Sequence, residues 1–327
     1  MTKAKKGVDA LPSMVEPTLF RHLASCKRIL VAGAGGGFDV YAALPIAAAL
    51  WNRGQTAFLA NLSFTHLAIA DGKPLVEGLH AVTPQTKGPD DYFPERLLAR
   101  FLESEGLPST VYAFERSGVA TLTAAYAWLV EKLDLDAIVL VDGGTDILMF
   151  GDEDGLGTPV EDMTSLAAVG QLRIAHRHVA CIGFGVDAYH GVSHGLVLEN
   201  IAALDRDGAY HGALSLSQYS AEGALYLRAV DHSQRQQHFA SIVNGSIGAA
   251  VSGQFGDVQF TQRTSNSELF INPLMSLYFT FDLMGLVQRN QYLRRLVGTP
   301  NAAHTALIIE QYRNEVEKVR ARRPIPH

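Results

Sequence analysis

The sequence predicts a Rossmann-like α/β fold, with a mainly parallel sheet flanked by helices and a more helical C-terminal third. Short β-branched runs alternate along the chain with longer helical stretches, a pattern typical of βαβ units. Two glycine-rich turns, 33–39 and 142–146, each follow an apolar run at the point where a buried strand should end. The expected strands are 28–33, 56–62, 110–114, 136–142 and 178–184, with a further pair at 258–263 and 276–281.

The expected helices fill the intervals between these strands, and three of them have recognisable starts. Thr158-Pro159-Val160-Glu161 matches a capping box with proline at the first helical position. Ser117 is placed to cap the helix that follows it, and Pro94 opens another. The full set is 39–52, 94–105, 118–133, 159–175, 192–204, 219–235, 237–252, 282–296 and 301–321.

The chain divides by composition into one large body and two short ends. Residues 1–20 are predicted to be a flexible N-terminal segment, 21–321 a single large α/β domain, and 322–327 a tail. Within the domain, 205–256 could pack as a helical subdomain. The stretch 63–92 lacks clear periodicity, and we interpret it as an active-site loop or lid.

Composition narrows the class of protein. The 327 residues are 47% hydrophobic and carry a net charge of −6, which is too apolar for disorder and gives no basic footprint for nucleic acid. No stretch is long and apolar enough to cross a membrane. Cys26 and Cys181 have no metal or redox spacing, so we expect buried, reduced thiols in a cytoplasmic protein. Apolar helical segments such as 302–309 could form a homo-oligomer interface or complete the core.

The first glycine turn contains an acidic residue where a phosphate-binding turn would have none. Glycines without a Cβ let backbone N–H groups approach a ligand, and the helix start beyond them attracts anions. A conventional dinucleotide motif would have a third glycine where Phe38 stands and an acidic residue where the second strand ends in Asn61. Asp39 would compete with a phosphate, so it either anchors a metal-bridged ligand or caps its own helix. The candidate binding glycines of this turn are Gly33, Gly35, Gly36 and Gly37.

The second turn is richer in acid. Asp142-Gly143-Gly144-Thr145-Asp146 begins a segment in which seven carboxylates fall within 21 positions. Oxygen ligands without His or Cys suit Mg²⁺ or Mn²⁺. We interpret the later group 152–155 as a solvent-exposed turn and Glu161 as a capping residue. The strand-end pair Asp142 and Asp146 is therefore the sharper catalytic candidate, with Asp39 and Asp146 as candidate metal ligands and Gly143, Gly144 and Thr145 as ligand-binding residues.

Three basic side chains follow other strand ends. His190 is a candidate general acid or base, and His194 a candidate ligand-binding residue, four positions further on. Gly191 weakens the helix that a metal-binding pair at this spacing would need. Arg116 follows the strand 110–114 and is a candidate substrate-binding cation. Neither a Gly-x-Ser-x-Gly elbow nor a Walker-type phosphate loop is present.

The loop motifs resemble those of an uncharacterised family, the domain of unknown function numbered 1152. The similarity lies in Gly35-Gly36-Gly37-Phe38-Asp39-Val40, in Gly143-Gly144-Thr145-Asp146 and in the segment 151–162. Phe281-Asp282 and Arg289-Asn290 are similar to the family's closing segment. The resemblance runs from about residue 28 to the end, and implies a Rossmann-like fold and a shared site around these loops. It implies no activity.

Three functional hypotheses follow. The first is an intracellular enzyme that binds a small polar or phosphorylated, nucleotide-like metabolite and performs metal-assisted hydrolysis or group transfer with a divalent cation. The second is an NAD- or FAD-dependent oxidoreductase, or a transferase, with a nonstandard glycine loop. The third is a non-catalytic ligand-binding or sensor protein. All three place the ligand at the same two turns.

Overall fold

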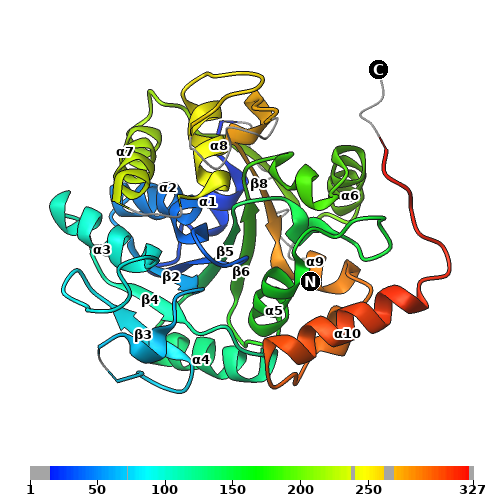
Figure 1. Cartoon of the computed structure of the whole chain (residues 1–327), viewed down its shortest axis with the longest axis horizontal. Helices are drawn as coiled ribbons and strands as arrows, with labels where there is room; N and C mark the ends of the chain where they lie inside the picture. The colour runs from blue at the N-terminus through cyan, green and yellow to red at the C-terminus, as the bar shows by residue number, and fades with distance from the viewer. Residues whose placement is uncertain (1–14, 72, 237–239, 261–268, 324–327) are drawn as a thin grey trace, which may run out of the picture.

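The computed structural model describes residues 15–71, 73–236, 240–260 and 269–323, and these form an α/β fold around one eight-stranded sheet. The strand order is β3-β4-β2-β1-β5-β6-β8-β7 (Figure 1). The strands β1, β2, β4, β5 and β6 are mutually parallel, whereas β3, β7 and β8 run antiparallel to their neighbours. The predicted mainly parallel α/β fold is therefore confirmed. The strands are β1 (Arg28–Gly33), β2 (Thr56–Leu62), β3 (Leu79–Val82), β4 (Val111–Phe114), β5 (Ala137–Asp142), β6 (His176–Cys181), β7 (Tyr210–Ser215) and β8 (Leu277–Asp282).

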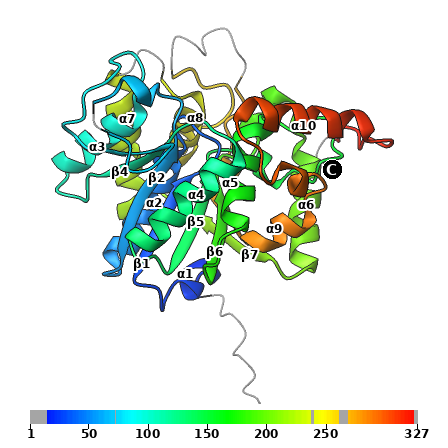
Figure 2. The same ribbon diagram turned by 90° about the horizontal axis from the view of Figure 1, so that it is seen from below.

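Helices cover both faces of the sheet. One face packs against α1 (Thr18–His22), α2 (Asp39–Asn52), α3 (Pro94–Ser104), α7 (Ala221–Gln236) and α8 (Ile242–Val251). The other packs against α4 (Val119–Lys132), α5 (Pro159–Gly170), α6 (His194–Arg206), α9 (Leu283–Arg289) and α10 (Ala302–Glu315). Figures 1 and 2 both show α7 and α10 on opposite sides of the molecule. Because the central strands are covered on both faces, their residues are apolar almost throughout: β5 is buried along its whole length.

The topology places the two glycine turns side by side. β1 pairs with β2 on one side and with β5 on the other, both in parallel, so the chain order reverses at β1. Ligands of open α/β sheets bind beyond the carboxyl ends of the strands at such a reversal. The turn after β1 and the turn after β5 meet there, and the Ala34 N–H donates to the Val141 carbonyl at 2.8 Å.

Several predicted boundaries are wrong. Residues 258–260 are not a strand, and 261–263 lie outside the described residues. β6 begins and ends earlier than the predicted 178–184, α5 ends at Gly170 before the predicted 175, and α10 ends at Glu315 before 321. The predicted helix 282–296 is α9 followed by a separate 3-10 turn, Leu293–Leu296.

Two edge strands were not predicted. β3 lies inside the stretch 63–92, so this stretch is not a continuous loop: it pairs with β4 at one edge of the sheet. β7 lies inside 205–256 and forms the other edge, paired with β8. Both are short, and β7 is exposed or half-buried throughout, which removes the apolar signal that a central strand carries.

Candidate functional site

The first glycine turn holds Asp39 in a buried position. Gly36 and Gly37 have φ of +93° and +63°, so the turn needs residues without a Cβ. Asp39 is the first residue of α2, and its Oδ2 accepts a 2.7 Å hydrogen bond from the Gly35 N–H. Burial and then the charge of Asp146 raise the pKa of Asp39 to about 7, while backbone N–H groups of the two turns oppose the shift. Phe38, rather than Asp39, is the N-cap residue of α2.

The second turn packs directly against Asp39. A Cβ on Gly143 would lie 2.8 Å from Asp39 Oδ1, so only glycine allows this approach. Asp142 ends β5, is buried, and accepts a 3.3 Å hydrogen bond from the Ile147 N–H. Asp146 begins a 3-10 turn, Asp146–Leu148, and its Oδ2 accepts 2.8 Å and 3.2 Å hydrogen bonds from the N–H and hydroxyl of Thr158.

Two further buried carboxylates complete the cluster. Asp162 comes from the first turn of α5, and Asp187 from the 3-10 turn Val186–His190 that follows β6. The Ser165 hydroxyl, in the middle of α5, donates to the Ala34 carbonyl at 2.8 Å, which holds α5 against the first glycine turn. Asp187 Oδ2 accepts a 2.7 Å bond from the Thr145 N–H. We call Asp39, Asp142, Asp146, Asp162 and Asp187 the aspartate cluster; all five are at most 8% exposed.

Three members of the aspartate cluster have a metal-ligand arrangement. One carboxylate oxygen from each of Asp39, Asp142 and Asp162 lies within 4.8 Å of the other two. The sequence predicts Asp39 and Asp146 as metal ligands, whereas the group of converging carboxylates contains Asp39 but not Asp146. Asp162 Oδ1 is buried and has no hydrogen-bond partner among the described residues, although such atoms are normally satisfied.

Among the described residues, no basic side chain forms an ion pair with the aspartate cluster. None of the ion pairs in the described part of the chain involves any of its five carboxylates. Burial is the largest cause that raises the pKa of Asp142, Asp162 and Asp187, and repulsion from the other carboxylates raises it further. These groups are therefore protonated in part or neutralised by a cation.

The predicted basic residues lie at the margin of this site. Burial raises the pKa of Asp146, whereas bonds from Thr158 and the charge of exposed His190 lower it. His190 and His194 do not share a helical face, because a 3-10 turn ends at His190 and α6 begins at His194. The His194 ring packs on Phe184, with centroids 5.3 Å apart, and burial lowers its pKa.

Arg116 is held at the rim by Glu161. Its Nε donates to Glu161 Oε1 at 2.6 Å, its guanidinium lies 5.6 Å from the ring centroid of Phe64, and 57% of its side chain is exposed. The predicted capping box is wrong in its hydrogen bonds: Thr158 is the N-cap of α5 but bonds to Asp146, and Glu161 pairs with Arg116. The predicted Ser117 cap is also wrong, since Gly118 is the N-cap of α4.

The acidic segment 152–155 is an anchor for the C-terminal region rather than the predicted solvent-exposed turn. Glu153 is fully buried and accepts 2.8 Å and 2.7 Å bonds from the N–H groups of Phe150 and Gly151. Arg320 donates to Asp152 Oδ1 at 2.7 Å and to Glu153 Oε1 at 2.9 Å. Two of the seven acidic residues counted in the sequence are thereby accounted for by structure.

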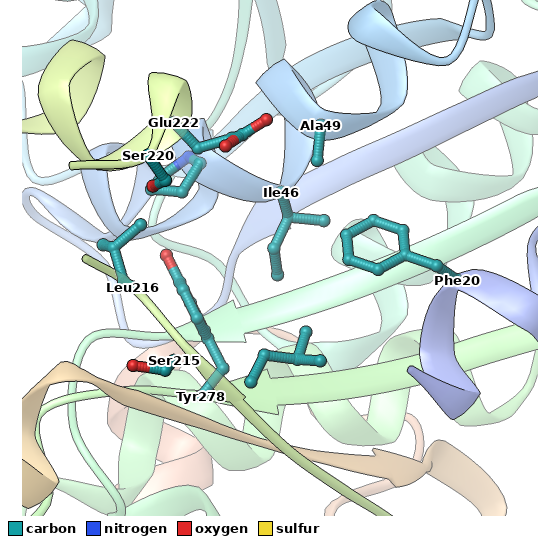
Figure 3. Close-up of a pocket in the computed structure, with 10 residues that line it drawn as sticks. Phe20, Ile46, Ala49, Ser215, Leu216, Ser220, Glu222 and Tyr278 are labelled. Carbon is teal, nitrogen blue, oxygen red and sulfur yellow. The ribbon is translucent and has the colours of Figure 1, made fainter. Parts of the chain in front are cut away.

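A separate hollow of about 250 Å³ lies away from the aspartate cluster, beside the edge strand β7 (Figure 3). Phe20, Ile46, Ala49, Leu216 and Tyr278 line it, with Glu222 at its margin. Ile46 is seven residues beyond Asp39 on α2, which is about 10 Å along the helix. Its lining is largely apolar and holds none of the predicted site residues.

Fold and site together define an α/β protein with a buried acidic centre at the reversal point of a mainly parallel sheet. The model of the family described as a protein of unknown function (DUF1152) matches residues 30–317, so the chain belongs to that family. This confirms the resemblance seen in the loop motifs. No curated protein and no solved structure matches the chain. Among the described residues, no helix has the length and apolar character needed to cross a membrane.

Proposed function

We propose that the protein is an enzyme that uses a divalent cation, Mg²⁺ or Mn²⁺, held by Asp39, Asp142 and Asp162, to hydrolyse or transfer a group of a small polar or phosphorylated, nucleotide-like metabolite. The observation that supports this most is the convergence of these three buried carboxylates. An octahedral Mg²⁺ with ligands at 2.0–2.1 Å separates adjacent oxygens by about 3 Å and opposite ones by about 4.2 Å. Oxygens already within 4.8 Å of one another need little movement to reach this geometry.

The chemistry follows from the position of the carboxylates. A cation here would polarise a phosphoryl or carbonyl oxygen and lower the pKa of a bound water. Asp146, Asp187 and the exposed His190 would remain to accept or donate a proton. Arg116, half-exposed over Phe64, would contact an anionic group at the rim.

Hydrogen bonding favours this proposal over a conventional dinucleotide cofactor. In a dinucleotide-binding fold, the N–H groups of the first turn are directed at a pyrophosphate. Here the Gly35 N–H already donates to the carboxyl group of Asp39, which takes the place of that phosphate. A cation bridging Asp39 to a phosphate would let the turn bind an anionic substrate without direct repulsion.

The test is Mn²⁺ binding to metal-depleted protein, measured by electron paramagnetic resonance, and then turnover. Asp142→Asn and Asp162→Asn should each lose Mn²⁺ binding and Mn²⁺-dependent release of phosphate from a panel of nucleotides and sugar phosphates. Asp154→Asn, an exposed carboxylate from the same segment, is the matched control and should behave as the wild type. Wild-type protein that binds no Mn²⁺, or turnover that survives Asp142→Asn, would contradict the proposal.

A further inference from the structure

A second cluster of metal-ligating side chains lies at the opposite end of β6 from the aspartate cluster. His22 ends α1, His178 is the third residue of β6, and His211 is the second residue of β7. Figure 2 shows α1 beside the ends of β6 and β7 on the side away from α10. His178 lies three residues before Cys181, the end of β6, which is about 10 Å along the strand. We call His22, His178 and His211 the histidine triad.

The ring centroids of the histidine triad have the spacing of a tetrahedral metal site, although the nitrogens of the three rings do not all lie within 4.8 Å of one another. Zinc binds imidazole nitrogen at about 2.0–2.1 Å, which places each ring centroid about 3.2 Å from the metal. Tetrahedral angles then separate the centroids by about 5.2 Å. The separations here are 5.6 Å for His22–His178, 4.6 Å for His22–His211 and 5.3 Å for His178–His211.

The buried member of the histidine triad lacks hydrogen-bond partners. His178 is 2% exposed, and neither ring nitrogen makes a hydrogen bond of ordinary distance and angle within the described residues; the backbone of Phe281 interacts with the ring weakly and raises its pKa. His211 Nε2 is also buried without a partner. Leaving such groups unsatisfied costs about 1–3 kcal/mol each, so a ligand for these nitrogens is the economical explanation.

The surroundings of the histidine triad disfavour the charged form of its rings. Burial, followed by the neighbouring histidines, lowers the pKa of His178 to about 3, and burial lowers the pKa of His211 to about 4. Burial, then the charges of Arg21 and His176, lower the pKa of His22, and the charge of Asp282 opposes the shift; Asp282 also opposes the shift of His211. His176 is a further neighbour, 6.4 Å from His178.

We propose that His22, His178 and His211 bind one zinc-like divalent cation and so fasten the short helix α1 to the edge of the sheet. The rings of His22 and His211 are now stacked at 26°, so their nitrogens must turn toward a common point. The terminal torsion of histidine has a broad minimum, which makes this rotation inexpensive. His22 is exposed and gives the cation a path from solvent, with water in the fourth position. This inference is independent of the proposed function at the aspartate cluster.

The test is a titration of metal-depleted full-length protein with Co²⁺ in excess Mg²⁺, which imidazole sites do not prefer. Wild-type protein should bind one equivalent with the visible absorption of tetrahedral Co²⁺, and Zn²⁺ should abolish that absorption. His178→Ala and His211→Ala should each weaken binding at least about 100-fold, because even the loss of outer-shell partners lowers affinity 10- to 100-fold. His304→Ala, an exposed histidine on α10, is the matched control.

Three results would overturn the proposal: no absorption in the wild type, absorption retained in both variants, or an equal loss in His304→Ala. If His178→Ala does not fold, His211→Ala and His22→Ala decide the matter, since both side chains are less buried. Asp142→Asn separates the two sites. It should leave the Co²⁺ absorption intact even where it removes Mn²⁺ binding, and loss of the Co²⁺ absorption in this variant would assign the signal to the aspartate cluster and refute the histidine site.

Discussion

Replacing Asp162 by asparagine should stabilise the metal-depleted protein. Its Oδ1 has no hydrogen-bond partner to lose, and ligand oxygens of Asp39 and Asp142 lie within 4.8 Å. Two unit charges at that separation repel by about 3.5 kcal/mol in an effective dielectric of 20. Partial protonation already relieves some of this repulsion, so we expect the free energy of unfolding to rise by about 1–3 kcal/mol at pH 8. This corresponds to an increase of roughly 2–6 °C in Tm.

The pH dependence of this gain has a definite sign. The folded-state pKa of Asp39 is about 7, above its ordinary value of 3.8. Stability due to proton binding is fully present below 3.8 and is lost as the pH rises through about 7. The wild type therefore loses stability over this window, and the advantage of Asp162→Asn should be smaller at pH 5 than at pH 8.

Saturating Mn²⁺ should make the wild type more stable than Asp162→Asn. A ligand at 1,000 times its Kd stabilises the folded state by about 4.1 kcal/mol, which exceeds the gain expected from Asp162→Asn, and only the wild type keeps the full ligand set. Thermal unfolding at pH 5 and 8, with EDTA or Mn²⁺, measures all four conditions, with Asp154→Asn as control. A lower Tm for Asp162→Asn at pH 8 in EDTA, or an equal rise in every condition, would refute the reasoning about buried repulsion.

Three further substitutions test the supports of the site. Gly35→Ala would place a Cβ 2.8 Å from Asp162 Oδ1 and Asp39 Oδ2, so it should weaken Mn²⁺ binding at least 10-fold. The control is Gly248→Ala on α8, whose Cβ would have no contact closer than 3.7 Å and should leave Mn²⁺ binding unchanged. Equal Mn²⁺ binding in the two variants would contradict this prediction. Asn61→Ala removes the 2.7 Å bond to buried Glu95 and should lower the free energy of unfolding by about 1–3 kcal/mol in urea titrations; an unchanged midpoint would contradict it. Arg320→Met leaves buried Glu153 without its cation and should destabilise by about 3–5 kcal/mol; a change below about 1 kcal/mol would argue that the backbone bonds to Glu153 suffice.

The central strands could be predicted from sequence because both of their faces are buried. β1 and β5 are continuous apolar runs, each followed by glycines. A short stretch of sequence is therefore enough to predict that each is a strand and where it ends. β7 carries Tyr210, His211 and Gly212 at a half-exposed edge and contains a register shift against β8, so neither apolar alternation nor length reveals it. Its pairing depends on β8, about 65 residues later in the chain.

The candidate site could be predicted only where it follows strand ends. Asp142 could be predicted because it ends β5, and Asp39 and Asp146 because they lie in the glycine turns that follow β1 and β5. Asp162 is one of the seven acidic residues in the sequence segment, but it follows no strand end, so the sequence does not single it out. Its position beside Asp39 and Asp142 depends on the packing of α5 against Ala34, which no local pattern records. Asp187 follows Gly183 and Gly185, and that repeat of the glycine-then-aspartate pattern was the available signal.

The attachment of Arg320 has a practical consequence for anyone who shortens this chain. The Arg320 N–H donates to the Asp152 carbonyl at 2.7 Å, and the Arg320 carbonyl accepts from the Asp154 N–H at 2.8 Å. The stretch after α10 is therefore hydrogen-bonded through its backbone to the segment that precedes Thr158. The Thr158 N–H in turn donates a hydrogen bond to Asp146 Oδ2. A chain that ends just after Glu315 would retain the strands and helices named above for the described residues, yet it would lose the backbone hydrogen bonds that hold the segment leading to Thr158 and the aspartate cluster.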